Sequence, residues 1–545
     1  MATGARPSET PPEAASPNIL DRAAAGLDGW LGVHQRLYLA AASLLCVVTF
    51  AGYAHERFIW ADEAIQLGIV RLGSLRQIWN ALHDSLQEDP PVLDWVIHFL
   101  LRAFGDSLFL ARLPSILCFC LMCLCLARIA WRYAPPAYAA ATFFLPFATT
   151  LRGWGSLARP YAPMLGFSAL TLLCWDNLQN ADGRRLWRWR IAFLFSLAIT
   201  LSTQFYSILI LLPLGLGELA KWIIRKRPDW PTILCMPLAL VPYCFWSPIL
   251  ISAGHTYLKH YYYKVEFQTL YEFFGSMVFS LPWAGLVLLL LFAAAWLGAK
   301  PAEAVQRPSI SQAHRLLLVV SCGFLLLPFC GYLGGVLWTG WFPPKYYMVA
   351  AFGLILWVPL LLPAVSFSRK VVGLCLFLAM AGHGLLVGAR GVSGFRRLER
   401  PYPSLAEIRR LIPDPHPDIV VSAPMHFGPF LEANKSDTSA HVLYLFDAQK
   451  EVAAYGTDAS DLTVGIGYER SIRLGRPSTT AAPFDAYVAT HRHFFILCMG
   501  EVLGIQEWQF KYLLNNLRAR MLWLGKAGVF DVYQVDLPTL APAGQ

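Results

Sequence analysis

The chain has 545 residues, of which 56% are hydrophobic and only 14% are charged. This balance lies outside the usual range of soluble domains and indicates a membrane protein with many spans. The formal net charge of +9 would favour nucleic acid binding in a soluble chain. Here the basic residues lie in short loops between apolar runs, where membrane orientation explains them, so we exclude a nucleic-acid partner.

The first 36 residues are polar and rich in Ala, Pro and Ser. They lack the short apolar core of a signal peptide. We therefore expect residues 1–36 to form a disordered cytoplasmic tail.

Apolar runs dominate the chain from residue 37 to residue 389. Because a spanning helix needs about 20 apolar residues, these runs predict about eleven transmembrane helices. The predicted spans are 37–54, 107–127, 136–151, 160–178, 191–203, 204–220, 231–251, 276–298, 316–338, 346–364 and 371–388.

The segment 91–104 resembles a span but is short, and Asp94, His98 and Arg102 recur along it at every fourth position. A single polar stripe favours a helix at the membrane interface. With this segment outside the bilayer, loops rich in Arg and Lys alternate with poorer loops. The positive-inside rule then places the N-terminus in the cytoplasm, and the loop 55–106 and everything after residue 389 outside it.

After Arg390 the apolar runs shorten to strand length and alternate with polar turns. Residues 390–545 are therefore predicted to form a soluble α/β domain outside the cytoplasm. The predicted strands are Asp418–Ser422, His441–Phe446, Phe494–Met499 and Val529–Val535, and the predicted helix is Trp508–Arg518.

Carboxylates occur in two places on the loop 55–106. Asp62 and Glu63 follow the first span, and Glu88 and Asp89 precede a double proline. A carboxylate can act as general base, and a pair can hold a divalent cation such as Mg²⁺ or Mn²⁺ against a phosphate, with Asp62 and Glu88 as candidate ligands. The alternative is that Asp62 and Glu63 cap the amphipathic helix that they open.

Cations occur at the predicted outward ends of three spans: Arg112, Arg159 and Lys345, the last followed by Tyr346. A cation in this position is a candidate for phosphate binding. The alternative is that each side chain extends to the lipid headgroups.

In order and spacing, these residues resemble the polyprenyl-phosphate-sugar-dependent glycosyltransferases of the GT-C superfamily. The similarity is to the branch of protein O-mannosyltransferases and 4-amino-arabinose lipid A transferases. The matching features are the Asp-Glu pair, the acidic double-proline segment about 25 residues on, Gly105-Asp106-Ser107, Arg112-Leu113-Pro114-Ser115, Ser156–Tyr161 and Lys345-Tyr346. At Asp89 the chain departs from the lipid A enzymes, which have Lys directly before the double proline.

The resemblance implies a GT-C-like fold and inverting transfer of a sugar from a polyprenyl-phosphate donor to a lipid, glycan or protein acceptor. It implies that Asp62 is the catalytic base. We assign Glu63 and Glu88 to its support, Asp89 to a second acid or acceptor group, and Arg112, Arg159, Lys345 and Tyr346 to the donor phosphate. The branch favours a bacterial inner membrane.

Two other classes of protein also fit outward cations and many spans: a transporter or flippase for lipid-linked saccharides, and a non-catalytic scaffold that binds lipid carriers. Transporters usually carry charges at the membrane midplane and on broken helices. Here Asp176 and Glu218 lie at predicted cytoplasmic span ends, so we expect an enzyme.

Overall fold

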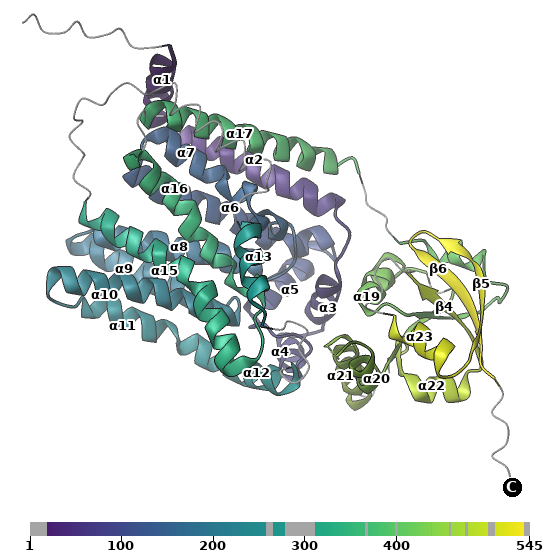
Figure 1. Cartoon of the computed structure of the whole chain (residues 1–545). Coiled ribbons are helices and arrows are strands. Elements are labelled where there is room, and N and C mark those ends of the chain that lie inside the picture. Colours follow the sequence, from purple (N-terminus) through teal and green to yellow (C-terminus); the bar gives the residue numbers. More distant parts are fainter. Residues whose placement is uncertain are drawn as a thin grey trace, which may run out of the picture.

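The computed structural model describes residues 19–257, 265–277, 311–365, 369–397, 402–437, 439–456, 459–474, 478–499 and 507–538. A bundle of long helices makes up most of this part of the chain, and a smaller sheet domain lies beyond one end of the bundle (Figure 1). This is the predicted polytopic helical fold with a C-terminal α/β domain.

Seven helical stretches among the described residues are long and apolar enough to cross a membrane, so the protein is an integral membrane protein. They are α2 (Gln35–Glu56), α6 (Leu108–Tyr133), η3 (Phe205–Ile210) with α10 (Leu211–Arg225), α11 (Trp230–Ala239) with α12 (Val241–Tyr257), α15 (Gln312–Gly334), η5 (Pro344–Ala350) with α16 (Ala351–Val365), and α17 (Arg369–Gly394).

Shorter helices complete the bundle: α7 (Pro136–Phe144), η1 (Leu145–Ala148), η2 (Thr150–Trp154), α8 (Tyr161–Gln179), α9 (Gly183–Leu201), α13 (Phe267–Met277) and η4 (Gly335–Thr339). The predicted span 276–298 lies, apart from its first two residues, outside the described residues. The total of about eleven spans therefore stays a prediction.

Small residues allow the helices of the bundle to approach closely. A Cβ at Gly52 of α2 would lie 1.8 Å from the carbonyl oxygen of Gly391 on α17, and one at Gly166 of α8 would lie 2.4 Å from that of Cys118 on α6. Contacts of this kind are typical of membrane helices, which gain van der Waals packing where side chains are small.

Residues 19–33 form a helix, α1 (Ile19–Val33), and the prediction of a disordered tail is wrong for this segment. Leu31 is buried against Ala137 and Ala140. Asp28 accepts a hydrogen bond of 2.9 Å from the amide of Ala137, in the first turn of α7, where backbone amides lack helical partners. Apolar contact and this cap order the segment.

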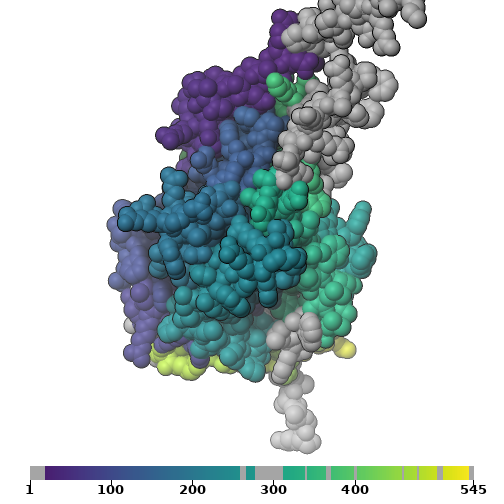
Figure 2. All heavy atoms as spheres, turned by 90° about the vertical axis from the view of Figure 1, so that its left-hand side faces the viewer, coloured from purple at the N-terminus to yellow at the C-terminus, as the bar shows by residue number. Residues whose placement is uncertain are grey.

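Helix α1 and the sheet domain lie at opposite ends of the bundle (Figure 1). Figure 2 views the bundle from the end that carries α1, and the yellow-green residues of the sheet domain show only along its lower edge.

The segment between α2 and α6, residues 57–107, is called the first loop below. It contains α3 (Ala61–Val70), α4 (Leu75–His83) and α5 (Val92–Phe104). Glu63 accepts a hydrogen bond from the amide of Trp60 at the start of α3, and Ser74 accepts one from Gln77 at the start of α4. These hydrogen bonds cap the N-terminal ends of α3 and α4.

The polar stripe of α5 faces the protein. Asp94 and His98 are buried, and Arg102 donates to the carbonyl of Gly73. On the other side of the helix, Val96 is 44% and Phe99 58% exposed. An interfacial helix is oriented in this way, with its apolar side open to lipid.

The sheet domain contains six strands in the order β3-β2-β1-β4-β6-β5. Strands β3, β2, β1 and β4 are parallel, and β6 and β5 extend the sheet in antiparallel pairing. The elements are α18 (Leu405–Arg409), β1 (Asp418–Val421), α19 (Pro424–Ala433), β2 (His441–Phe446), α20 (Ala448–Tyr455), α21 (Ala459–Arg473), β3 (Ala481–Pro483), α22 (Phe484–Thr490), β4 (His493–Cys498), α23 (Trp508–Asn515), β5 (Arg520–Ala527) and β6 (Phe530–Asp536).

Alternate residues of the central strands enter two apolar cores. In the register, Ile419 of β1 lies between Val442 of β2 and Phe495 of β4, in one core. Val420 points to the opposite face and packs in the other core. The four predicted strands are confirmed to within one residue at each end, as expected for strands buried on both faces. The predicted helix begins at Trp508 as expected and ends three residues earlier, at Asn515.

The sheet domain docks on the first loop (Figure 1). Arg71, just after α3, donates to both carboxylate oxygens of Glu432, in the last turn of α19, at 2.6 and 2.8 Å. Arg470 of α21 pairs with Asp84, at the end of α4, at 3.2 Å. The first loop is therefore enclosed between the helical bundle and the sheet domain.

Candidate active site

A fully buried ion pair between Glu63 and Arg112 fixes the first loop to the bundle. Arg112 Nε donates to Glu63 Oε1 at 2.9 Å and Nη2 donates to Oε2 at 2.7 Å, and both side chains have no exposed surface. Glu63 Oε1 also accepts a hydrogen bond of 2.7 Å from the amide of Ala158, ahead of α8. The carboxylate is thus held by three segments of the chain.

Arg112 uses its remaining donors on backbone carbonyls. Nη1 donates to Ala54 and Arg57, at 2.7 and 2.6 Å, and Nη2 donates to Phe58 at 3.0 Å. A guanidinium engaged in this way has no group left for a phosphate, and Glu63 has none left for a substrate proton. The geometry therefore gives these two residues a positioning role, which agrees with the supporting role expected for Glu63 and differs from the phosphate-binding role expected for Arg112.

Arg159 lies between two other acids. Its Nη2 is 3.8 Å from Asp62 Oδ2 and 3.6 Å from Asp89 Oδ2. Both distances exceed a hydrogen bond, so the carboxylates attract the guanidinium without occupying its donors. Its Nε is buried without a hydrogen-bond partner among the residues described here. Tyr161 lies beside it, with 5.8 Å from Arg159 Cζ to the ring centroid.

Lys345 and Tyr346 reach the same site from η5. Lys345 Nζ lies 5.4 Å from the centroid of the Tyr346 ring, and that ring stacks on Tyr206 with centroids 4.2 Å apart. Tyr206 belongs to η3, which carries no charge pattern in the sequence. The prediction missed it because only the tertiary fold brings it to Tyr346.

The acids of the site differ in environment. Burial, and then the neighbouring charge of Asp89, raises the pKa of Glu88 to about 7, against the opposing charges of Lys345 and Arg159. Burial also raises the pKa of Asp89, opposed by Arg159 and by a hydrogen bond from Gln87. The side chain of Asp62 is 37% exposed, compared with 8% for Asp89. Asp62 is thus the more accessible of these two carboxylates.

The structure therefore brings together Asp62, Glu88, Asp89, Arg159 and Lys345, with Tyr346 beside them. Within the described ranges, no three His, Cys, Asp or Glu side chains are arranged to hold a metal ion. Arg159 already lies between Asp62 and Asp89. A divalent cation at Asp62 and Glu88 gains no support from this arrangement and stays a prediction.

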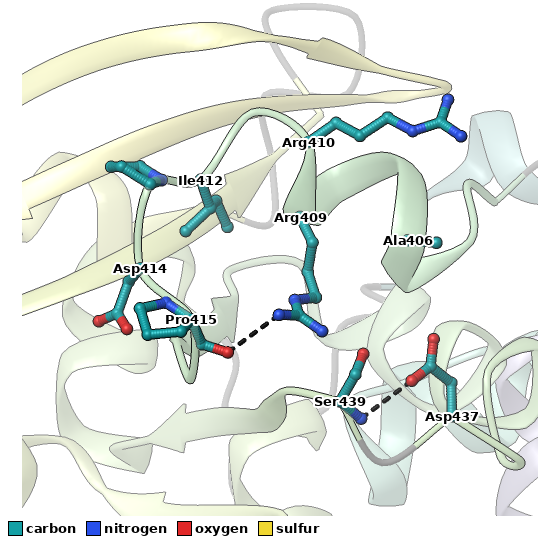
Figure 3. Close-up of a pocket in the computed structure, with 9 residues that line it drawn as sticks. Ala406, Arg409, Arg410, Ile412, Asp414, Pro415, Asp437 and Ser439 are labelled. Carbon is teal, nitrogen blue, oxygen red and sulfur yellow. Dashed lines mark hydrogen bonds between the residues drawn. The ribbon is translucent and has the colours of Figure 1, made fainter.

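A separate open pocket of about 600 Å³ lies in the sheet domain (Figure 3). In it, Arg409 points to the carbonyl of Pro415 and donates a 3.0 Å hydrogen bond, and the amide of Ser439 donates to Asp437. The pocket contains none of the predicted site residues.

Comparisons with known proteins support the fold. Residues 88–249 match the family model described as dolichyl-phosphate-mannose-protein mannosyltransferase. The chain is also similar to the crystal structure of ArnT from Cupriavidus metallidurans bound to undecaprenyl phosphate, with a TM-score of 0.53 and 15% identity over 93% of this chain and 98% of that one.

The apo structure of the same ArnT gives a TM-score of 0.48 and 16% identity over 92% of this chain and 98% of that one. No curated protein sequence matches the chain. The resemblance to GT-C glycosyltransferases that the sequence indicates is confirmed at the level of the fold.

We predict that Arg112→Met destabilises the protein by about 3–5 kcal/mol, because it leaves the Glu63 carboxylate buried without its charge partner. Thermal unfolding of the purified protein in detergent measures this. Arg102→Met, at an exposed position on α5, is the matched control and should change the melting temperature little. Equal melting temperatures for both variants would contradict the positioning role.

A second prediction concerns pH. The folded state raises the pKa of Glu88 from 4.5 to about 7. Between these two pH values, the folded protein therefore binds more protons than the unfolded protein. Stability should therefore fall as pH rises through this range. In thermal unfolding, Glu88→Gln should have the same stability as the wild type at a pH near 4.5, and it should be more stable than the wild type at a pH above about 7. Glu407→Gln, exposed on α18, serves as control, and parallel pH profiles for wild type and Glu88→Gln would refute the shift.

Proposed function

We propose that this protein is a membrane glycosyltransferase that moves a sugar from a polyprenyl-phosphate donor to a lipid, glycan or protein acceptor, with inversion, on the extracytoplasmic face. One observation carries the proposal: a partly exposed carboxylate, Asp62, lies 3.8 Å from Arg159, a buried cation with an unpartnered Nε. A base and an anion site side by side are what such a transfer requires.

In the proposed reaction, Asp62 accepts the proton of an acceptor hydroxyl as its oxygen attacks the anomeric carbon of the sugar. The bond between that carbon and the phosphate oxygen breaks on the opposite face, which inverts the configuration. Polyprenyl phosphate leaves with the electron pair. Arg159 and Lys345 stabilise the negative charge that develops on it.

The other acids have supporting roles in this proposal. Glu88, whose pKa is about 7, can hold the acceptor hydroxyl and exchange a proton near neutral pH. Asp89 is the second partner of Arg159 and keeps this cation in place before the donor binds. The stacked rings of Tyr206 and Tyr346 form an aromatic wall beside Lys345.

The choice of donor rests on the relatives. The ArnT structure holds undecaprenyl phosphate, and the matching family model is named for dolichyl-phosphate mannose. Both are sugar carriers of the polyprenyl-phosphate class. The alternation of basic loops supports a cytoplasmic N-terminus and an extracytoplasmic sheet domain, and the similarity to a bacterial ArnT supports an inner-membrane location.

We predict that Asp62→Asn lowers transfer by about 10²–10⁴-fold, because the amide has nearly the same shape but cannot accept a proton. Donor affinity should change little. Turnover of a labelled polyprenyl-phosphate sugar in proteoliposomes measures the loss, with Asp106→Asn on the same loop as control. Near-normal turnover in Asp62→Asn at normal expression would exclude Asp62 as the base, and absence of any donor turnover in the wild type would favour a transporter or scaffold.

A further prediction concerns the cations. Charge-assisted contacts contribute about 1.5–3 kcal/mol each, so Arg159→Ala and Lys345→Ala should each weaken binding of undecaprenyl phosphate by roughly tenfold to a hundredfold. Lys345→Arg should retain most affinity. Binding is measured by titration in detergent, with Arg102→Ala as control. Normal binding by both alanine variants would mean that the cations are interfacial anchors and not the phosphate site.

A further inference from the structure

Two glutamine–aspartate pairs lie in the first loop next to the candidate active site. Gln66 of α3 donates through Nε2 to Asp94 Oδ1 of α5, and Gln87 donates through Nε2 to Asp89 Oδ2, both at 2.9 Å. Gln66 and Asp94 are each 1% exposed, and Gln87 and Asp89 are each 6% exposed. Sequence reasoning gave no role to either glutamine.

Each pair leaves at least one buried oxygen without a hydrogen-bond partner. Among the residues described, Gln66 Oε1, Gln87 Oε1 and Asp94 Oδ2 are buried and have no partner. A buried polar oxygen without a partner is unfavourable and uncommon, so each one indicates an absent ligand or water. Three of them on two adjacent pairs indicate one hydrogen-bonding subsite.

The subsite adjoins the cation assigned to the donor phosphate. Asp89, the partner of Gln87, has its Oδ2 3.6 Å from Arg159 Nη2. Burial, and then the charge of Asp89, raises the pKa of Asp94 to about 8, and the charge of Arg159 opposes this rise. Both pairs therefore lie within electrostatic reach of Arg159.

The chemistry of the lining selects the ligand. The unpartnered amide oxygens accept hydrogen bonds, so the ligand must donate them. The hydroxyl groups of a sugar are donors of this kind. In a polyprenyl-phosphate sugar, the sugar is bonded directly to the phosphate, so a phosphate on Arg159 places the sugar ring next to the subsite.

We propose that Gln66 and Gln87 bind the hydroxyl groups of the sugar that the donor carries, and so select for the hydroxyl groups of that sugar. This inference rests on the proposed function, because it assumes that Arg159 holds the phosphate of the donor. A site built to hydrogen-bond hydroxyls discriminates strongly against a ligand that lacks them, since its buried acceptors are then left unpaired.

The test compares lipids with and without the sugar. Binding of undecaprenyl phosphate and of its mannosyl, glucosyl and galactosyl derivatives is measured for wild type, Gln66→Met and Gln87→Met. Methionine keeps nearly the same volume and removes the amide, which includes both the acceptor Oε1 and the Nε2 donor to the paired aspartate. We expect the wild type to bind at least one sugar-bearing lipid more tightly than undecaprenyl phosphate. Each variant should bind that sugar-bearing lipid about tenfold more weakly than the wild type does, with the affinity for undecaprenyl phosphate unchanged.

Gln509→Met is the matched control. Gln509 is also fully buried with an unpartnered Oε1, but it lies on α23 of the sheet domain, so the preference for the sugar should persist in that variant. The inference would be overturned if Gln66→Met and Gln87→Met lost affinity equally for undecaprenyl phosphate and for the preferred sugar-bearing lipid, or lost none. The unpartnered oxygens would then be assigned to buried water.

A measurement on the wild type alone covers the case in which the variants do not fold. Deoxy analogues of the preferred sugar should bind at least tenfold more weakly when the missing hydroxyl is one that the subsite holds. Equal binding by all deoxy analogues would overturn the inference. A wild type that binds undecaprenyl phosphate and its glycosylated forms equally refutes only the sugar subsite, whereas one that binds none of them refutes the proposed function as well.

Discussion

The geometry of the candidate site depends on the buried pair of Glu63 and Arg112. Glu63 directly follows Asp62 in the chain, and the amide that it holds belongs to Ala158, directly before Arg159. One carboxylate therefore sets the positions of both the proposed base and the proposed phosphate ligand. A buried ion pair is costly to desolvate, but here backbone groups satisfy its remaining donors and acceptors. Its gain is a fixed geometry more than added stability.

Arg159 illustrates how the charges around it are balanced. Two carboxylates, those of Asp62 and Asp89, lie just beyond hydrogen-bond distance and neutralise the buried cation, while Nη1 donates to the backbone carbonyl of Asp62 at 3.4 Å. A direct salt bridge to either acid would have to be broken before a phosphate could bind. Because the site is largely shielded from water, the attraction of Arg159 for an incoming phosphate is weakly screened and remains strong.

The extent to which sequence reasoning succeeds follows from the range of the interactions involved. Buried strands such as His441–Phe446 were predicted from local apolar runs, and the grouping of Asp62, Asp89 and Arg159 agrees with the motif order. The pairing of Glu63 with Arg112 was missed because it joins residues 49 positions apart, and a charge pattern does not show which cation meets which acid. The contact of Tyr206 with Tyr346 and the pairing of the two glutamines with aspartates were missed for the same reason, because the sequence does not show which side chains meet in the fold.

The first loop is held from two sides by interactions of unequal strength. On the bundle side, the Glu63–Arg112 pair has no exposed surface, so water and salt do not weaken it. On the side of the sheet domain, Arg71 and Glu432 remain 30% and 20% exposed, and exposed pairs contribute roughly 0–1 kcal/mol each. The Glu63–Arg112 pair therefore holds α3, and with it Asp62, more firmly to the membrane bundle than the Arg71–Glu432 pair holds the loop to the sheet domain.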